Sequence, residues 1–210
     1  MTILLIVIAV VILWSVWGYF SSRVEQAQYT VLKEADGYEV REYAAHIEAQ
    51  TTVGGSYEDA LAAGFRIIAG YIFGGNTKKE RITMTAPVVA KNGEDLKASE
   101  KIAMTAPVVA TAAGDSQVIS FGMPRSATLE TLPTPNDPRV KIVTVPAKKY
   151  AARRFSWYRS DARVRSTQEK LLKALGRDGI VTVGSAAYAG YNAPWTPPWM
   201  MRNEVLVEIK

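Results

Sequence analysis

Patterns typical of strands and helices follow the same order twice in this chain, and this repetition is the strongest constraint on its fold. Residues 29–75 and residues 140–179 each contain short runs of alternating apolar and polar residues, followed by a longer segment with apolar residues at helical spacing. A shift of 102 residues superposes Asp59 on Asp161, near the start of the two helical segments. The order strand, strand, helix and further strand predicts an α+β domain whose antiparallel sheet, curled toward a distorted barrel, carries two helices.

Turn and cap residues indicate where several of these elements begin and end. Asp36-Gly37 predicts the turn of a hairpin between two alternating runs. Ser56 is a suitable N-cap for the first helix, and Gly74-Gly75 ends it. The last strand is expected at residues 204–209. No linker separates the two halves, so residues 29–210 are expected to form one domain.

An uncharged apolar segment precedes this domain. Residues 3–20 carry no charged side chain and, at ~1.5 Å per residue, form a helix that with its flanks is about long enough to cross a hydrocarbon core of ~30 Å. Trp14, Trp17 and Tyr19 lie near its C-terminal end, where amphipathic rings favour the headgroup region of a membrane. We therefore expect residues 3–20 to contact the lipid bilayer.

This segment allows two locations for the domain. Residues 1–22 as an uncleaved signal-anchor, with residues 23–28 as a linker, predict a single-pass membrane protein whose domain lies on the periplasmic or extracytoplasmic side. A cleaved signal peptide would instead release the domain into the periplasm. The anchor is favoured because no Lys or Arg precedes the apolar run and no clear small-residue cleavage site follows it.

The composition argues against several classes of chemistry. Cysteine is absent, so the chain forms no disulfide, no thiolate metal site and no cysteine nucleophile. His46 is the only histidine, which removes any multi-histidine zinc site. Neither a glycine-rich phosphate loop nor a nucleophile elbow occurs. Because these motifs are absent, we do not expect an enzyme. The net charge of +5 arises from scattered basic residues typical of a solvated surface, so we do not expect a nucleic-acid-binding protein either.

One nine-residue segment occurs twice at close range. Residues 82–90, "ITMTAPVVA", and residues 102–110, "IAMTAPVVA", differ only at Thr83 against Ala103. Neither copy carries a charged side chain, and its proline fits the edge, the end or a bulge of a strand. Both copies are therefore expected to line or edge the sheet, with residues 91–101 as an exposed excursion between them.

Several strings of the sequence together resemble the SOUL family of haem-binding proteins over residues 29–209. In chain order these strings are "YEVREY", "YIFGGNTKKERITMTAPV", "SEKIAMTAPV", "VISFGMPR", "LPTPNDPRVKI" and "AAYAGYNAPWTPPWMMRNEVLVEI". The resemblance implies one domain of two β-α-β-β pseudo-repeats, a twisted sheet or barrel with two helices, and the binding of haem or another porphyrin. The implied fold is also similar to effector-binding domains of the gyrase-inhibitor type.

The resemblance also implies where a tetrapyrrole would bind. Some members of the family have a histidine axial ligand at the position of Glu42, and a carboxylate replaces imidazole poorly there. Another mode holds the ring on the apolar face of the first helix with nearby cations for the propionates; Ala62 and Gly70 stand where those cations are expected, and Arg66 is the only cation on the helix. The candidate residues on this helix are Phe65, Arg66, Ile68, Tyr71 and Ile72.

Further candidates lie outside the helix, each beside a structural alternative. His46 is a possible axial ligand or a surface residue, and Met84 and Met104 are possible thioether ligands or core residues. Prolines stiffen the loop that carries Trp195, Trp199, Met200 and Met201, which would grip a flat ligand, cap the barrel, or touch lipid beside the anchor. Glu204 either meets a cationic ligand or pairs with Arg202 or another cation.

Three functions remain open at this point. The first is non-catalytic binding of haem or a related tetrapyrrole at the membrane for storage, transfer or buffering, with haem as a ligand that folding does not require. The second is an effector-type binding module, or a minor hydrolase, for another flat apolar small molecule. The third is a structural or interaction protein of the envelope that binds no ligand.

Overall fold

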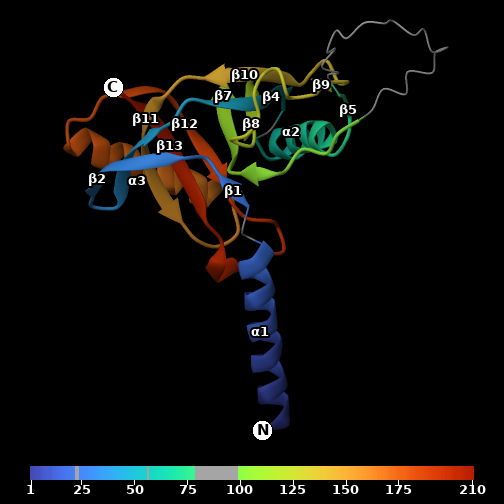
Figure 1. Cartoon of the computed structure of the whole chain (residues 1–210). Coiled ribbons are helices and arrows are strands. Elements are labelled where there is room, and N and C mark those ends of the chain that lie inside the picture. The colour runs from blue at the N-terminus through green and yellow to red at the C-terminus, as the bar shows by residue number, and fades with distance from the viewer. Residues whose placement is uncertain (22–23, 56, 79–98) are drawn as a thin grey trace, which may run out of the picture.

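The computed structural model describes residues 1–21, 24–55, 57–78 and 99–210, and most of its strands join one large sheet (Figure 1). Its helices are α1 (Thr2–Ser21), α2 (Tyr57–Ile72), α3 (Asp161–Arg177) and the short 3₁₀ helix η1 (Pro198–Met200). The strands of the large sheet are β2 (Tyr29–Ala35), β3 (Tyr38–Tyr43), β4 (His46–Gly54), β7 (Val108–Ala113), β8 (Ser116–Gly122), β10 (Lys141–Val145), β11 (Lys148–Phe155), β12 (Thr182–Gly190) and β13 (Asn203–Ile209). Four two-residue strands form separate ladders: β1 (Glu25–Gln26), β5 (Asn76–Thr77), β6 (Thr105–Ala106) and β9 (Thr134–Pro135).

The large sheet is antiparallel and open. Its nine strands follow the order β10-β4-β8-β7-β12-β13-β11-β3-β2, and every neighbouring pair runs antiparallel. The edge strands β10 and β2 do not pair with each other in the described part of the chain, so the sheet does not close into a barrel. The α+β sheet with two helices is confirmed, and of the two forms expected, the twisted sheet is the one that the chain adopts.

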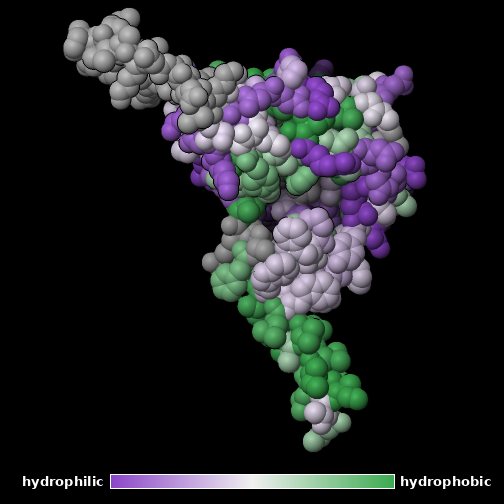
Figure 2. All heavy atoms as spheres, turned by 90° about the vertical axis from the view of Figure 1, so that its right-hand side faces the viewer, coloured by the Kyte–Doolittle hydropathy of each residue, from purple (hydrophilic) through white to green (hydrophobic). Residues whose placement is uncertain are grey.

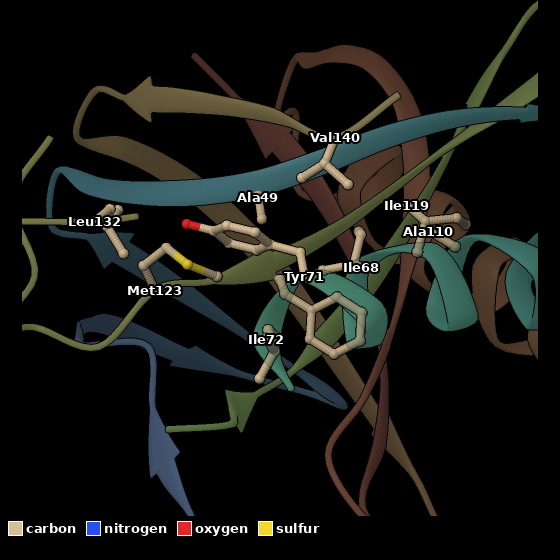
Figure 3. Packing of buried hydrophobic residues seen from close by; sticks show 10 residues of the cluster. Ala49, Ile68, Tyr71, Ile72, Ala110, Ile119, Met123, Leu132 and Val140 are labelled. Atoms are coloured by element: carbon tan, nitrogen blue, oxygen red, sulfur yellow. The ribbon is translucent and has the colours of Figure 1, made fainter. Parts of the chain in front are cut away.

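Each half of the sheet carries one helix on the same face. Helix α2 packs on β4 and β8, where Ile68, Tyr71 and Ile72 are buried against Ala49 and Phe121 (Figure 3). Helix α3 packs on β11 and β13 through a second cluster that contains Leu171, Leu175, Ala151, Val205 and Val207. Two equivalent helix-on-sheet cores therefore account for the repeated order of the sequence patterns.

The opposite face of the sheet carries no helix in the described structure. Successive side chains in a strand point to opposite faces, so the neighbours of the residues under α2 and α3 lie on this second face. On β4 these neighbours are His46, Glu48 and Gln50, and on β13 they are Glu204, Leu206 and Glu208. Polar and charged residues thus gather on one surface, called here the helix-free face.

Helix α1 projects away from the sheet, and most of its side chains are exposed (Figure 1). Residues Thr2–Phe20 are long and apolar enough to cross a membrane, by length and composition alone. In Figure 2 this helix forms an apolar column beneath a largely polar domain. The expected N-terminal helix is confirmed as a helix that could be an anchor or a signal.

Residues 24–28 of the connector pair with the domain, although their polar composition favours a linker. Strand β1 pairs with β6 in parallel, so that Gln26 lies opposite Ala106. The guanidinium of Arg202 donates hydrogen bonds to the Gln26 side chain (3.0 Å) and to the Tyr29 hydroxyl (3.1 Å). Residues 24–28 are therefore attached to the sheet along most of their length.

The second copy of the repeated segment ends in an interior strand of the large sheet. It supplies β6 and the start of β7, which pairs with β8 and β12, and a cis peptide joins Ala106 to Pro107 between the two strands. The proline occupies the break between two strands, as its missing N–H requires. The first copy, with Met84, lies outside the described residues, as does most of the predicted excursion; residues 99–101 at its end are exposed.

Candidate functional site

Two adjoining cavities open on the helix-free face. The first, about 440 Å³, is lined by residues from β3, β4, β7, β8 and β10 to β13. The second, about 490 Å³, lies between the connector residues 25–28, the β3–β4 turn and the loop after β8. Ala27, His46, Gly122 and Thr144 line both cavities. These volumes lie within the range of ~300–1,000 Å³ that is usual for small-molecule sites.

His46 begins strand β4 at the boundary of the two cavities, and both of its ring nitrogens have partners. Nδ1 lies 2.8 Å from the carbonyl oxygen of Ala44, and Nε2 lies 3.0 Å from the Glu48 carboxylate. The hydrogen bond with Glu48 raises the pKa of His46. Burial opposes ionisation of Glu48, but hydrogen bonds from His46 and Gln50 outweigh it and hold the pKa of Glu48 below its usual value. The pair therefore favours an imidazolium next to a carboxylate.

A second ion pair lies across the cavity floor. Lys148 on β11 donates to Glu208 on β13 at 2.7 Å, and both side chains are about one-third exposed. Tyr150 lines the same cavity, and burial raises the pKa of its hydroxyl to about 12, so the hydroxyl stays protonated at neutral pH. The rest of the lining is mainly apolar, with Ala106, Pro107, Val109, Val118, Val143, Val145, Ala187 and Leu206. The arrangement suits a flat apolar molecule with polar groups at its rim.

Glu204 lies on the same face, but its side chain is not accessible to solvent or to a ligand. It is fully buried, and Arg41 donates to both of its oxygens at 2.6 and 3.1 Å. Arg202 and the Tyr191 hydroxyl donate at 2.9 and 2.8 Å. Burial alone would raise the pKa of Glu204, but the two arginines hold it below its usual value. The carboxylate is thus committed to internal pairs and does not line either cavity.

The candidate residues on α2 separate into a buried group and an exposed pair. Ile68, Tyr71 and Ile72 belong to the core between helix and sheet, and the Tyr71 hydroxyl donates to the carbonyl of Pro133 at 3.0 Å. The apolar face of this helix is therefore covered by the sheet. Phe65 is 38% exposed and contacts Phe121, while Arg66 is exposed and donates to its own helix at Ala62.

The tryptophan-rich loop contacts helix α1. Trp195 and Trp199 pack on Trp17 and Trp14, with ring centroids 6.0 and 5.5 Å apart, and Met200 lies in η1 beside them. These contacts place the loop beside α1. Neither tryptophan, nor Met200, lines the two cavities of the helix-free face.

The remaining candidates lie apart. Met104 is half-buried and lines neither cavity, and Glu42 is exposed on β3. No group of three or more metal-ligating side chains occurs in the described ranges of the chain. Among the candidate positions that the structure describes, His46 is therefore the one that lines these two cavities.

Sequence reasoning missed Glu48, Lys148, Tyr150 and Glu208 as site residues. The available signal was alternation: His46, Glu48 and Gln50 stand at every second position of one strand, and so do Lys148 and Tyr150 in another. Sequence alone does not show which strands are neighbours, and the two groups meet only because β4 and β11 both border the same cavity.

The antiparallel sheet with two helices is also found in several solved structures. The chain is similar in fold to the structure of the EcmrR C-terminal domain, with a TM-score of 0.58 and 8% identity over 87% of this chain and 98% of that one. It is also similar to an uncharacterized conserved protein from Listeria innocua (TM-score 0.52, 11% identity, 82% and 92% covered) and to a hydrolase from the same organism (0.50, 11%, 85% and 94%). At this identity the likeness establishes the fold alone.

The sequence also matches the model of one protein family. The model of the SOUL heme-binding protein family matches residues 24–97 and 91–208, which together are nearly the whole domain. The chain therefore belongs to the SOUL heme-binding protein family. No curated protein matches the chain.

Proposed function

We propose that this domain binds haem or a related tetrapyrrole without transforming it, in the cavities of the helix-free face, with His46 as the residue closest to the ligand's metal. The observation that carries the proposal is the position of His46, the only histidine of the chain, at the boundary of both cavities. Storage, transfer or buffering of the ligand at a membrane is the role that such reversible binding would serve.

The residues present fit this group. The Ala44 carbonyl fixes the Nδ1 side of the His46 ring, as backbone carbonyls commonly do for metal-bound histidines, and Nε2 would be free to act as a ligand once it loses its proton and its bond to Glu48. Apolar strand residues such as Val109 and Val118 would contact the faces of the ring. Lys148 and, in the second cavity, Arg125 are the cations available for its propionates.

Titration of the full chain with hemin in detergent micelles tests the proposal. Since the pKa of His46 is raised, Nε2 keeps its proton at about pH 6 and loses it only as the pH rises through that raised pKa, so the affinity should rise with pH. His46→Ala should lower the affinity and remove this pH dependence. A matched variant, Phe65→Ala with Arg66→Ala on the exposed edge of α2, should leave the titration unchanged.

Three results would contradict this site. The absence of a saturable Soret shift would exclude haem as the ligand. An unchanged hemin titration of the His46→Ala variant would show that His46 does not contribute to binding. A loss of binding in the Phe65 and Arg66 variant alone would instead favour the outer edge of α2, the surface implied by the other mode of the family.

A second candidate function rests on the two carboxylates in the first cavity. Glu48 and Glu208 would attract a flat organic cation if it displaced their partners His46 and Lys148. A planar cationic dye should then raise the melting temperature while hemin does not, and Glu48→Gln with Glu208→Gln should abolish that rise. A dye-insensitive melting temperature excludes this function.

We also propose that residues 1–22 anchor the protein by a single pass with the domain outside the cytoplasm. The support is the length and apolar composition of Thr2–Phe20 and its position at the N-terminus of the chain. A phosphatase that is active only outside the cytoplasm, fused after Lys210, should be active in intact cells. An inactive fusion in the presence of full-length protein would reverse the orientation.

A further inference from the structure

All five tryptophans of the chain gather at one place, although they come from three distant segments. Trp14 and Trp17 lie on α1, Trp157 follows β11, and Trp195 and Trp199 flank the start of η1. We call this group the tryptophan collar. It lies where α1 meets the domain, and Figure 1 shows η1 next to the C-terminal end of the helix.

Direct contacts hold the collar to helix α1. The rings of Trp14 and Trp199 meet edge to face at 5.5 Å, and the indole N–H of Trp14 donates to the carbonyl of Trp195 at 2.9 Å. Gly18 permits this approach, since a Cβ added there would lie 2.5 Å from Cδ of Pro197. The loop thus lies alongside the last two turns of α1.

Trp157 joins the collar through its backbone. Its N–H donates to the carbonyl of Pro198 at 3.0 Å, and its own carbonyl accepts from the Asn203 amide at 2.8 Å. Its φ of 74° is a left-handed conformation that costs a residue with a side chain about 1–3 kcal/mol. The ring nevertheless remains 54% exposed, so burial within the protein does not offset this cost.

We propose that the tryptophan collar lies in the interface between lipid and water and seats the domain on the membrane surface. Trp195 and Trp199 are 53% and 47% exposed although they touch α1, so each ring has one side in the protein and one side free. Indole rings prefer the headgroup region, where an apolar body and a polar N–H are both satisfied. The collar adjoins exposed apolar side chains of α1 such as Val16 and Phe20, which makes lipid its natural neighbour.

This seating would fix the direction in which the cavities face. Helix α1 is held to the domain by the Trp14 hydrogen bond to Trp195 and by the packing of Trp14 and Trp17 on the loop, and these contacts limit how far the domain can turn about α1. Glu25, which lines the second cavity, lies four residues after Ser21 and is therefore at most ~15 Å from the end of the helix. A ligand dissolved in the bilayer would meet that cavity close to the membrane surface.

Quenching of single tryptophans by lipids tests the inference, which rests on the membrane location of α1 and not on haem binding. The full chain is placed in phosphatidylcholine vesicles that contain lipids spin-labelled near the headgroup. Each variant keeps one of Trp17, Trp157, Trp195 and Trp199 and has phenylalanine at the other four tryptophan positions. The control has phenylalanine at all five and carries Val181→Trp, at the far end of β12 and ~25 Å from the collar.

Quenching by the labelled lipid should be at least about threefold steeper at Trp157, Trp195 and Trp199 than in the Val181→Trp control, and similar to that at Trp17. Aqueous acrylamide should quench the control more strongly than these three. Efficient lipid quenching at Trp17 with control-like behaviour at the other three would show that the domain stands off the membrane. If the labelled lipid did not quench Trp17, α1 would not lie in the bilayer. Either of these two results overturns the inference. Single Trp→Phe changes in the otherwise natural chain, each lowering the lipid-quenchable emission, repeat the test if the multiple variants fail to fold.

Discussion

Glu204 links three parts of the chain through one buried charge. Its carboxylate is fully buried between Arg41 and Arg202, and the nearer guanidinium nitrogen of Arg41 is 2.6 Å away. Removing one partner from a buried ion pair leaves the other charge without compensation, which costs about 3–5 kcal/mol. Since the fold lowers the pKa of Glu204 below the ordinary value of 4.5, this stabilisation is present above that pH and is lost as acid protonates the carboxylate.

We predict that Glu204→Gln lowers the free energy of unfolding by about 3 kcal/mol at neutral pH, as measured by urea denaturation. Glu39→Gln is the matched control, because Glu39 also pairs with Arg41, at 2.7 Å, but its side chain is 39% exposed. An exposed pair contributes only ~0–1 kcal/mol. Equal losses in the two variants would show that the burial of Glu204 does not matter.

The direction of single side chains was the most predictable property at this scale. Strand alternation indicates that Glu204 points inward, and a buried carboxylate requires a cation. The local partner Arg202 was foreseeable from its position two residues away. The main partner Arg41, 163 residues away in sequence, was not, since nothing in the sequence shows that β3 lies two strands from β13.

Helix α2 depends on one close approach to the sheet. Gly64 is buried, and a Cβ added there would overlap the side chain of Ile119 on β8. Gly70 lies on the same helix but is exposed, with no atom within 4 Å of an added Cβ. The two glycines therefore have opposite requirements, although each is an unfavourable helix residue in itself.

We predict that Gly64→Ala lowers the free energy of unfolding by about 1–3 kcal/mol, because the helix must move away from the sheet. Gly70→Ala should raise it by about 0.5–1 kcal/mol, through a better helix former and a more restricted unfolded chain. Chemical denaturation of both variants measures the difference in sign. A stabilising Gly64→Ala would mean that Ile119 yields without cost.

Helices and turns whose ends are marked by neighbouring residues, such as glycine pairs and Asp-Gly, were predicted well. The first helix is expected to end at the Gly74-Gly75 pair and ends at Ile72, and the Asp36-Gly37 turn joins β2 to β3 as expected. Strand β1 was missed, because two polar residues become a strand only by pairing with β6, some 80 residues later. Helical periodicity identified the apolar face of α2 but not its partner, which is the sheet.

At the scale of the whole molecule, helix α1 stands outside the cores. The three clusters of buried apolar residues in the described ranges contain no residue before Val24. Removal of residues 1–21 should therefore leave a folded domain, whose melting temperature changes by less than about 5 °C. Calorimetry of the shortened chain measures this, and loss of a cooperative transition would show that α1 is part of the fold.

The overall architecture was predictable because repetition limits the possible arrangements. Two copies of one order of elements predict two helix-on-sheet units, and both occur. Whether such a sheet closes depends on the register and twist of nine strands together, which no single segment encodes. The cavities are unpredictable for the same reason, since His46 and Glu208 share a cavity only once the strand order is fixed.

The height of the tryptophan collar on α1 determines how much of the helix is left for the lipid chains. Trp14 lies on the side of the collar nearest the N-terminus, so only Thr2–Leu13, about 18 Å at ~1.5 Å per residue, extends beyond it. A typical hydrocarbon core is ~30 Å thick. With indole rings at the headgroup level, this helix would be too short for such a bilayer and would require local thinning. The proposed seating therefore depends on thinning of the bilayer around α1, and the protein should partition more strongly into vesicles of short-chain lipids than into vesicles of long-chain lipids.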